Sequence, residues 1–467
     1  MDVVALSLAE VLANNEQHRL MYYKRCEDYY DGKHPLHVPE KYKAMLEQGY
    51  GVRTNYCAPI VDAPVSRLKV ECIQCDDEQA KEFLDACWRK NRMDAKSVKT
   101  HRAAIKKGDA FLQIWPHFPQ GTLKPDGYSI KFLTPDIVFP YYADDDDESL
   151  QYVKKQWLAW GENGLPMARK DMFYPDRIER YYNDATMTYP LSDFAKTAWL
   201  PYELDGQPAV IQNPYGVIPI VHFRNKEDDS PMGTSGLHDA FHIQDGINKL
   251  IIDLMRTADF QAFRQRWIAG VTEDEIPLVD GKRVLTSNPG DVWRFDEPDV
   301  KTGEFSEGNL TQILEAIDKM VDHLCAVTRT PKSVLQDSDG TASSGFALEK
   351  VEAPLLDKVS ENQVSFGSAY ADLCRILMIM GAYHGDCPKA DVEAWIDWKD
   401  ATSESPADKL SDAQRKQILK VNNVISARQW AKEEGYTEED INRMQEEMKI
   451  EAETSMGALI GHSMTAE

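Results

Sequence analysis

The sequence predicts an α+β protein that is mainly helical. Apolar residues recur at helical spacing near the N-terminus, across 235–264 and 310–328, and again across 344–380. Between about 109 and 225, short segments instead alternate or are rich in β-branched and aromatic residues. Hydrophobic residues make up 42% of the 467 residues and charged residues 28%, which is typical of a folded, soluble chain of two to four domains.

The first hundred residues predict helices around one strand. "LAEVLANNEQHRLMYYKRCEDYY" has helical spacing and ends near Gly32, and two further helices are expected near 77–90 and 94–107. Cys72 and Cys75 form a lone CxxC in "LKVECIQCDD". We interpret it as part of a half-buried strand, because a zinc site needs four ligands and no second CxxC follows.

Two amphipathic helices, over 235–264 and 310–328, flank a small β-rich insert at 266–309. Their stripes are too wide for two helices to cover, so we expect neighbouring copies of the chain to bury them. The residues expected at this oligomer interface are Ile243, Ile247, Leu250, Ile251, Leu254, Leu310, Ile313, Leu314, Ile317, Met320, Val321 and Leu324.

The C-terminal third predicts a loop, a long helix, a strand over 391–398 and an acidic helical tail. Pro354 falls inside the long helix, where it removes one backbone hydrogen bond and predicts a kink. The longest apolar run, 376–383, is too short to span a bilayer, and the N-terminus lacks the features of a signal peptide. We therefore expect a soluble protein made in a cytoplasm, with no membrane partner.

Gly340 and Gly345 have the glycine spacing of a phosphate-binding loop. A nucleotide site would continue with Lys and then Ser or Thr, but Phe346 and Ala347 stand there, so a polar loop ahead of a helix is favoured. His238 and His242 are four residues apart, as in a zinc-binding pair, but no third ligand follows nearby. The sequence thus predicts no metal, no cofactor and no catalytic residue.

The formal net charge of −24 argues against a protein that grips nucleic acid, because such binding depends on Lys and Arg displacing counterions. The same charge is compatible with a protein past which DNA moves without being held.

The order of several stretches resembles the portal (head-to-tail connector) proteins of tailed bacteriophages, of the SPP1-like siphophage type. The resemblance rests on "YYDGKH", "RTNYCAPIVDAPVSRLKVECI", "NPYGVIPIVHFRN", "GTSGLHDAFHIQDGINKLIIDLM", "ADFQAFRQRWIAG", "NPGDVWRF", "TRTP" and "SSGFALEKVEAPLLDKV". It covers about 20–400, and the ordered set is more specific than any single motif.

The resemblance implies a portal fold that assembles as a ring, with twelve subunits expected, around passing double-stranded DNA. It divides the chain into a wing (1–233, with a return strand at 382–400), two stem helices (234–264 and 310–330), a clip (265–309), a tunnel loop (331–343), a kinked helix (344–381) and a helical crown or tail (401–467).

The resemblance also assigns roles to residues and partners. The DNA-facing residues around the tunnel loop would be Asp337, Ser338, Asp339, Gly340, Thr341, Ala342, Ser343 and Ser344. Cations facing the channel would come from Lys249, Arg256 or Arg264, and contacts of the clip with its partners from Pro289, Gly290, Trp293 and Arg294. The expected partners are the large subunit of the terminase motor, the head-tail adaptor, and the major capsid and scaffold proteins.

The implied function is therefore a structural ring in the virion, made in the cytoplasm of a bacterial host, through which the genome is packaged and ejected. Two alternatives stay open at this point. One is a nucleotide hydrolase at Gly340 and Gly345, or a metal hydrolase at His238 and His242. The other is an oligomeric scaffold or adaptor that conducts no DNA.

Overall fold

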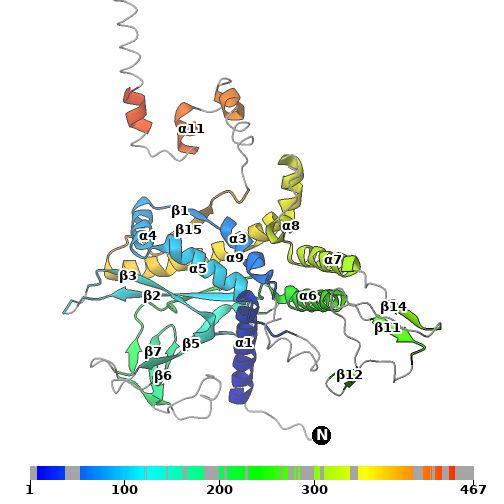
Figure 1. The fold of residues 1–467 in the computed structure, drawn as a ribbon. Helices are drawn as coiled ribbons and strands as arrows, with labels where there is room; N and C mark the ends of the chain where they lie inside the picture. The colour runs from blue at the N-terminus through cyan, green and yellow to red at the C-terminus, as the bar shows by residue number, and fades with distance from the viewer. Residues whose placement is uncertain are drawn as a thin grey trace, which may run out of the picture. The chain divides into compact units, whose positions relative to one another are not determined.

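The structure, a computed structural model, forms two compact units, Met1–Ala401 and Thr402–Glu467. It describes residues 8–36, 53–119, 121–122, 124–143, 146–160, 166–183, 199–203, 208–226, 230–262, 266–271, 278–279, 282–283, 299–304, 310–336, 345–402, 414–420, 422, 426–433 and 441–447. Helices and strands mix throughout the first unit, as the predicted α+β class requires (Figure 1).

The core of the first unit lies between helices and one face of a three-stranded antiparallel sheet. The sheet has the order β10 (Ile220–Arg224), β2 (Asp109–His117), β3 (Gly127–Leu133). Leu112 and Ile114 of β2 point to the helices, whereas Phe111 packs into a second cluster on the opposite face. The central strand β2 is therefore apolar on both faces, which explains why its sequence does not alternate.

The helices of this core are α1 (Leu8–Tyr30), α3 (Cys57–Arg67), α4 (Glu78–Lys90), α5 (Met93–Lys107) and α9 (Gly345–His384). Of these, α4, α5 and α9 pack on the sheet, while α1 and α3 pack mainly on α5 and on each other. The expected helices near 77–90 and 94–107 are thus confirmed within one residue. Asp77 caps α4, because its carboxylate accepts a hydrogen bond from the Ala80 N–H at 3.0 Å.

The lone CxxC lies on a strand, as expected. β1 (Val70–Cys75) pairs antiparallel with β15 (Ala394–Trp398), so segments more than 300 residues apart form one two-stranded sheet. A six-stranded sheet of the first unit contains β4 (Val138–Ala143), β5 (Asp146–Trp160), β6 (Pro166–Phe173), β7 (Arg177–Asn183) and β8 (Leu200–Pro201), with β9 (Val210–Gln212) also on β7.

Helix α9 is the central helix of the core. It is long and apolar enough over Lys350–His384 to pass for a membrane span by length and composition, which the sequence prediction had not anticipated. More than half of its most apolar window is buried inside the protein, with Val359, Phe366 and Tyr370 fully covered. Packing against the chain's own core therefore accounts for its composition. Pro354 lies inside this continuous helix, and the expected kink stays a prediction.

Two long helices form an arm that leaves the core and returns to it. The chain runs out along α6 (Phe241–Ala262), which follows the 3₁₀ turn η5 (His238–Ala240), and comes back along α7 (Leu310–Thr328) (Figure 1). β11 (Arg266–Ala269) and β14 (Lys301–Glu304) pair antiparallel at the far end, and β12 (Leu278–Val279) pairs with β13 (Lys282–Arg283). The short helix α8 (Lys332–Leu335) follows α7.

The second unit is described only in part. Its described residues are helical over 414–420, over α11 (Ala427–Glu433) and over 441–447, in keeping with the helical tail expected from the sequence.

Candidate functional site: the two-helix arm and its junction with the core

Helices α6 and α7, which we call the two-helix arm, pack closely because a glycine stands at their contact. A Cβ atom at Gly246 would lie 2.8 Å from Cε of Met320, nearer than side chains normally approach. Ile247, Val321 and Leu324 fill the interior beside this contact and are fully buried. The two helices therefore cover part of each other's apolar stripe.

This packing corrects one expectation. Ile247, Val321 and Leu324 cannot contribute surface to a contact between subunits, because the chain's own core already covers them. Leu314, by contrast, is 52% exposed. The other members of the expected interface are half-buried: Ile243, Leu250, Ile251, Leu254, Leu310, Ile313, Ile317 and Met320.

Two of the three candidate channel cations are paired on their own helix. Lys249 Nζ lies 2.9 Å from Asp253, and a guanidinium nitrogen of Arg256 lies 3.5 Å from the same carboxylate. Both cations are therefore partly neutralised by one acid. Arg264 lies outside the described residues, as do the clip residues Pro289, Gly290, Trp293 and Arg294.

The first residues of the expected tunnel loop and the residues just before it are bound to two helices. Lys332 Nζ donates to Asp318 at 2.7 Å and to Asp322 at 2.8 Å on α7, and these two hydrogen bonds raise the pKa of Lys332. Arg329, whose φ is +53°, binds Glu361 on α9 at 2.8 Å. The eight expected DNA-facing residues, Asp337 through Ser344, lie outside the described residues.

The arm joins the core through a buried carboxylate, Asp109, which was not among the residues predicted from the sequence. Asp109 is completely buried at the start of β2 and accepts hydrogen bonds from Tyr23 at 2.6 Å and from the Gly233 N–H at 2.7 Å. Arg19 of α1 forms an ion pair with it and also donates to the Gly233 carbonyl at 2.7 Å. The loop that leads into α6 is thereby fixed to α1 and β2.

His222 completes this network. Its Nε2 lies 2.9 Å from Asp109, and its Nδ1 lies 2.7 Å from the Tyr142 hydroxyl. Burial lowers the pKa of His222, so the neutral ring donates from Nε2 and accepts at Nδ1. Burial alone would raise the pKa of Asp109, but the hydrogen bond from His222 and the charge of Arg19 outweigh it and hold that pKa below its usual range.

Two glycines let the backbones cross beside Asp109. A Cβ at Gly233 would lie 2.1 Å from the Gly108 carbonyl oxygen, and one at Gly108 would lie 2.5 Å from the Gly233 oxygen. Gly108 also has φ of +100°, a conformation that residues with side chains rarely adopt. In the sequence, Gly108 and Asp109 stand between the helix expected near 94–107 and an apolar stretch, a pattern that indicates only a break between helix and strand.

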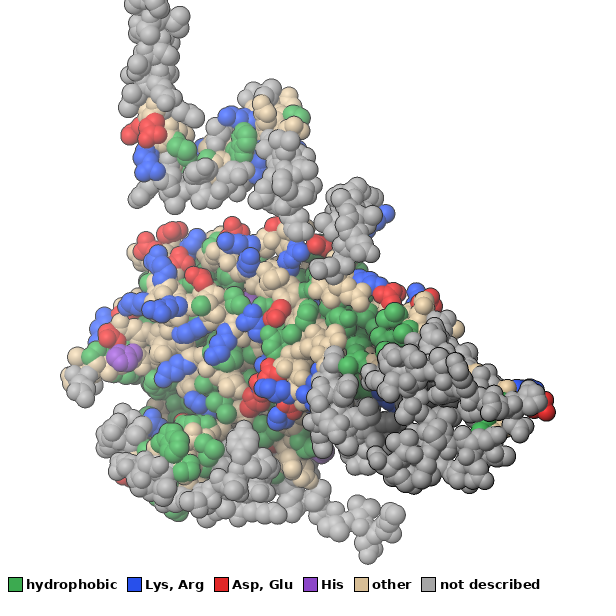
Figure 2. Space-filling model, viewed as in Figure 1, with side chains coloured by type: hydrophobic (Ala, Val, Ile, Leu, Met, Phe, Trp, Pro, Cys, Tyr) green, Lys and Arg blue, Asp and Glu red, His purple; other side chains and the backbone are tan. Residues whose placement is uncertain are grey.

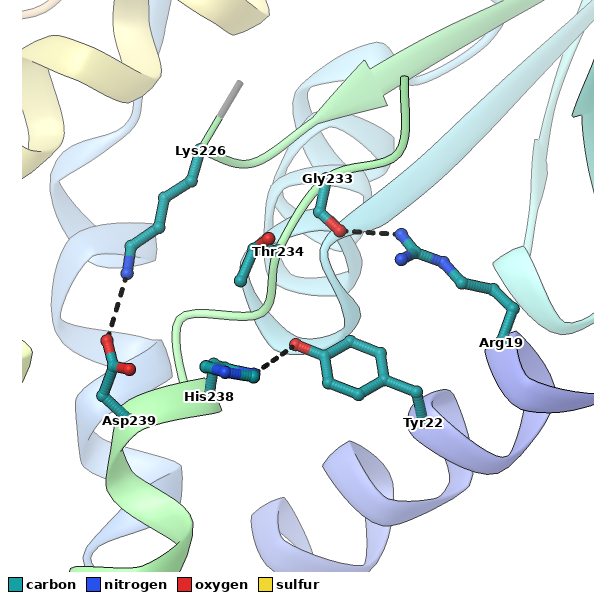
Figure 3. Close-up of a pocket in the computed structure, with 7 residues that line it drawn as sticks. All are labelled: Arg19, Tyr22, Lys226, Gly233, Thr234, His238 and Asp239. Atoms are coloured by element: carbon teal, nitrogen blue, oxygen red, sulfur yellow. Dashed lines mark hydrogen bonds and ion pairs between the residues drawn. The ribbon is translucent and has the colours of Figure 1, made fainter. Parts of the chain in front are cut away.

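A pocket of about 460 Å³ opens at this junction. Figure 3 shows Tyr22 and Arg19 of α1 facing His238, Asp239 and Lys226 across it. Tyr22 OH lies 3.5 Å from His238 Nδ1, and Lys226 Nζ lies 3.6 Å from Asp239. Each labelled charge in the pocket thus has a partner within the chain.

The histidine pair of the metal hypothesis does not form a three-ligand site. His238 lies in η5 beside Tyr22, while His242 is exposed on α6. Within the described ranges, no group of three or more His, Cys, Asp or Glu side chains could hold a metal ion.

Comparison with known proteins identifies the family. The sequence profile of the family "Phage portal protein, SPP1 Gp6-like" matches residues 9–454. The chain therefore belongs to this family of phage portal proteins.

The curated relatives and the solved structures that match this chain share less than a quarter of their aligned residues with it. The portal proteins of Mycobacterium phages D29 and L5 are 22% identical over 441 residues and 23% identical over 429 residues, covering 92% and 90% of this chain and 84% and 83% of theirs. Chains from the virion of a native gene transfer agent particle and from the neck of an empty one align with TM-scores of 0.41 and 0.43 and 14% identity. These cover 86% and 87% of this chain and 96% of each of theirs.

Proposed function

We propose that copies of this chain form a ring of twelve subunits at one vertex of a phage capsid, and that double-stranded DNA passes through its axis during packaging and ejection. The observation that carries the proposal is the family match, which spans residues 9–454. The role is structural, with no catalytic step, and the protein is a component of the virion.

The proposed regions follow the elements of the fold. The α+β part with its return strand β15 is the wing, the two-helix arm is the stem, and the short strand pairs at its far end belong to the clip. Residues 331–343 are the tunnel loop, α9 links stem to wing, and the chain from 401 is the crown. In this assignment the clip meets the terminase motor and later the head-tail adaptor, while capsid and scaffold proteins surround the ring.

Charge supports passage rather than retention of DNA. Twelve copies at −24 each carry a formal charge of −288. Affinity for a duplex rises with every phosphate that a cation neutralises, so few free cations along a bore mean weak, transient contact. On the described part of the arm and α8, Lys249, Arg256 and Lys332 are each paired with a carboxylate, in agreement with that requirement.

The stem interface is tested at Leu314, which is exposed in one chain although it is a large apolar residue on α7. Leu314→Asp should abolish rings while leaving the chain folded, because a charge would have to be buried between subunits. Gln312→Asp adds the same charge at an exposed polar position of the same helix and should assemble normally.

Negative-stain images and native mass measurement give the readout. A wild-type preparation that contains only compact monomers or dimers under packaging conditions would remove the ring from consideration. Turnover of ATP by the purified protein, abolished by Gly345→Ala, would favour the hydrolase alternative. If Leu314→Asp assembles as well as the wild type does, the ring uses another face of the stem.

A further inference from the structure

One short part of this acidic protein is strongly basic. Residues 89–107 contain eight Lys and Arg and one Asp, a formal charge of +7, so the other residues together carry −24 − 7 = −31. The segment covers the end of α4, the turn after it and all of α5. Figure 2 shows the corresponding Lys and Arg side chains gathered over α4, α5 and β3 on the viewed face.

Five of these cations lie beside the outer edge of β3, and a sixth, Lys131, lies on that strand. We call the six the basic row: Arg89, Lys90, Arg92, Lys96, Lys99 and Lys131. Lys90 Nζ donates to the Asp126 carbonyl at 3.2 Å, and Lys96 Nζ donates to that of Ile130 at 2.5 Å. Lys99 lies 4.5 Å from the centre of the Phe132 ring. Asn91 fixes the helix turn against the strand through the Tyr128 carbonyl and the Ile130 N–H.

No member of the basic row has a carboxylate within ion-pair distance among the described residues, unlike the paired cations of the arm. Asp94 accepts a hydrogen bond from Trp88, and Asp126 is engaged by His117. Burial, together with the neighbouring charge of Lys131, lowers the pKa of Lys96, as expected where two cations lie close together. All members except Lys96 are exposed.

The row has the dimensions of a phosphate backbone. Residues 126–132 of the β3 edge span about 20 Å at roughly 3.3 Å per residue. One strand of duplex DNA presents about six phosphates over that length. The row is thus long enough for several simultaneous contacts.

The surface lacks what a protein interface needs. No large apolar side chain of 81–107 or of β3 is exposed in the described structure, so an acidic protein surface, including that of a second copy, would find no apolar anchor. A phosphate backbone needs only cations. Within a Debye length of about 8 Å at physiological salt, the local charge outweighs the distant acids.

We propose that the basic row binds the phosphate backbone of double-stranded DNA on the outer surface of the wing, away from the axial channel. The inference rests on the proposed portal function for the presence of DNA around the ring. It adds a second place of contact, with DNA that is not passing through the bore. Binding there is independent of base sequence, because the cations contact phosphates, which every DNA sequence carries.

The test uses preassembled rings and a closed circular duplex, which has no end to enter a channel. The fourfold variant Arg89→Gln, Arg92→Gln, Lys99→Gln and Lys131→Gln removes exposed cations whose side chains donate no hydrogen bond within the described part of the chain. Loss of four phosphate contacts should lower the slope of log K against log salt by about 3 to 4. Binding at low salt should weaken by more than tenfold.

A matched control removes four exposed cations that are already paired: Lys24→Gln, Lys33→Gln, Lys319→Gln and Arg375→Gln. Its net charge equals that of the test variant, so an effect of total charge alone would appear in both variants. Because the control keeps the basic row intact, it should bind the circle like the wild type. Equal losses in both variants, or no binding by the wild type, would overturn the proposal.

Electron microscopy of the same samples separates the two proposals. Rings that fail to bind the circle contradict the basic row and leave the portal function standing. Absence of rings in the wild type contradicts the proposed function itself. If the test variant loses rings while the control keeps them, the row serves contact between subunits, and the DNA proposal is wrong.

Discussion

Lys358 offers the sharpest test of the packing at the junction. It lies on α9 and is almost wholly buried, with Nζ 3.4 Å from the Thr328 carbonyl oxygen at the end of α7. Burial lowers its pKa to about 8 from 10.5, and the charges of Lys226 and Arg329 add to this, while Glu361 and Asp239 oppose it. Replacing Lys358 with Met removes the buried charge and keeps most of the volume.

The magnitude follows from the two pKa values. Each pKa unit corresponds to about 1.4 kcal/mol, so the 2.5-unit difference implies a cost of about 3 kcal/mol at pH 7, where both states are protonated. Loss of the hydrogen bond to Thr328 offsets about 1 kcal/mol. Lys358→Met should therefore raise the free energy of unfolding by about 2 kcal/mol at pH 7.

Removing this charged residue should stabilise the protein at pH 7, and the size of the stabilisation should depend on pH. Between pH 8 and 10.5 the unfolded state binds more protons at this position than the folded state, so Lys358 costs less as pH rises. By pH 9.5 the wild type should have recovered about 2 kcal/mol relative to the variant. The difference between the two proteins should thus shrink from about 2 kcal/mol to near zero.

Urea titrations at pH 7 and pH 9.5, followed by tryptophan fluorescence, measure this difference. The buried cysteines and tyrosines titrate in the same range in both proteins, so their contributions to the free energy of unfolding cancel in the difference. Lys24→Met, at an exposed lysine paired with Asp28, should give a difference that does not change with pH. A difference for Lys358→Met that stays constant between the two pH values would refute a buried, charged lysine.

Two further changes probe the attachment of the arm. Asp109→Asn should lower the free energy of unfolding by about 3 kcal/mol, because it leaves the Arg19 charge without its partner, and urea unfolding that matches the wild type would contradict this. Gly233→Ala should prevent stable folding, since its Cβ would lie 2.1 Å from the Gly108 oxygen. Gly216→Ala, with φ of +67° but open space around it, should cost only about 1 to 2 kcal/mol and serves as the control.

Local patterns were sufficient to predict the elements. The helices α4 and α5 begin and end within one residue of expectation, because amphipathic spacing and a capping Asp77 act over a few neighbouring residues. The two arm helices and the strand that returns at 394–398 were also expected. Membership of the portal family was recognisable from the order of short motifs and is confirmed over 9–454.

Contacts across the fold could not be predicted in this way. Asp109 meets Arg19, which lies 90 positions earlier, and Gly233, which lies 124 positions later. No periodicity in the sequence links three such positions, because the sheet and the helices bring them together only after folding. The apolar stripes of α6 and α7 were visible, but only packing revealed that Ile247, Val321 and Leu324 are covered within one chain.

The charges of this protein likewise show what the sequence determines and what only the tertiary structure decides. The sequence by itself determined the net charge of −24, and with it the expectation that DNA is not held along the chain. Only the tertiary structure decided where the opposing charges lie. It pairs Lys249 and Lys332 with carboxylates on the arm, whereas Arg89, Lys99 and Lys131 beside β3 have no carboxylate at ion-pair distance among the residues that the structure describes. Electrostatic interactions in salt act over about one Debye length, so spatial neighbours, rather than the total, determine what each surface binds.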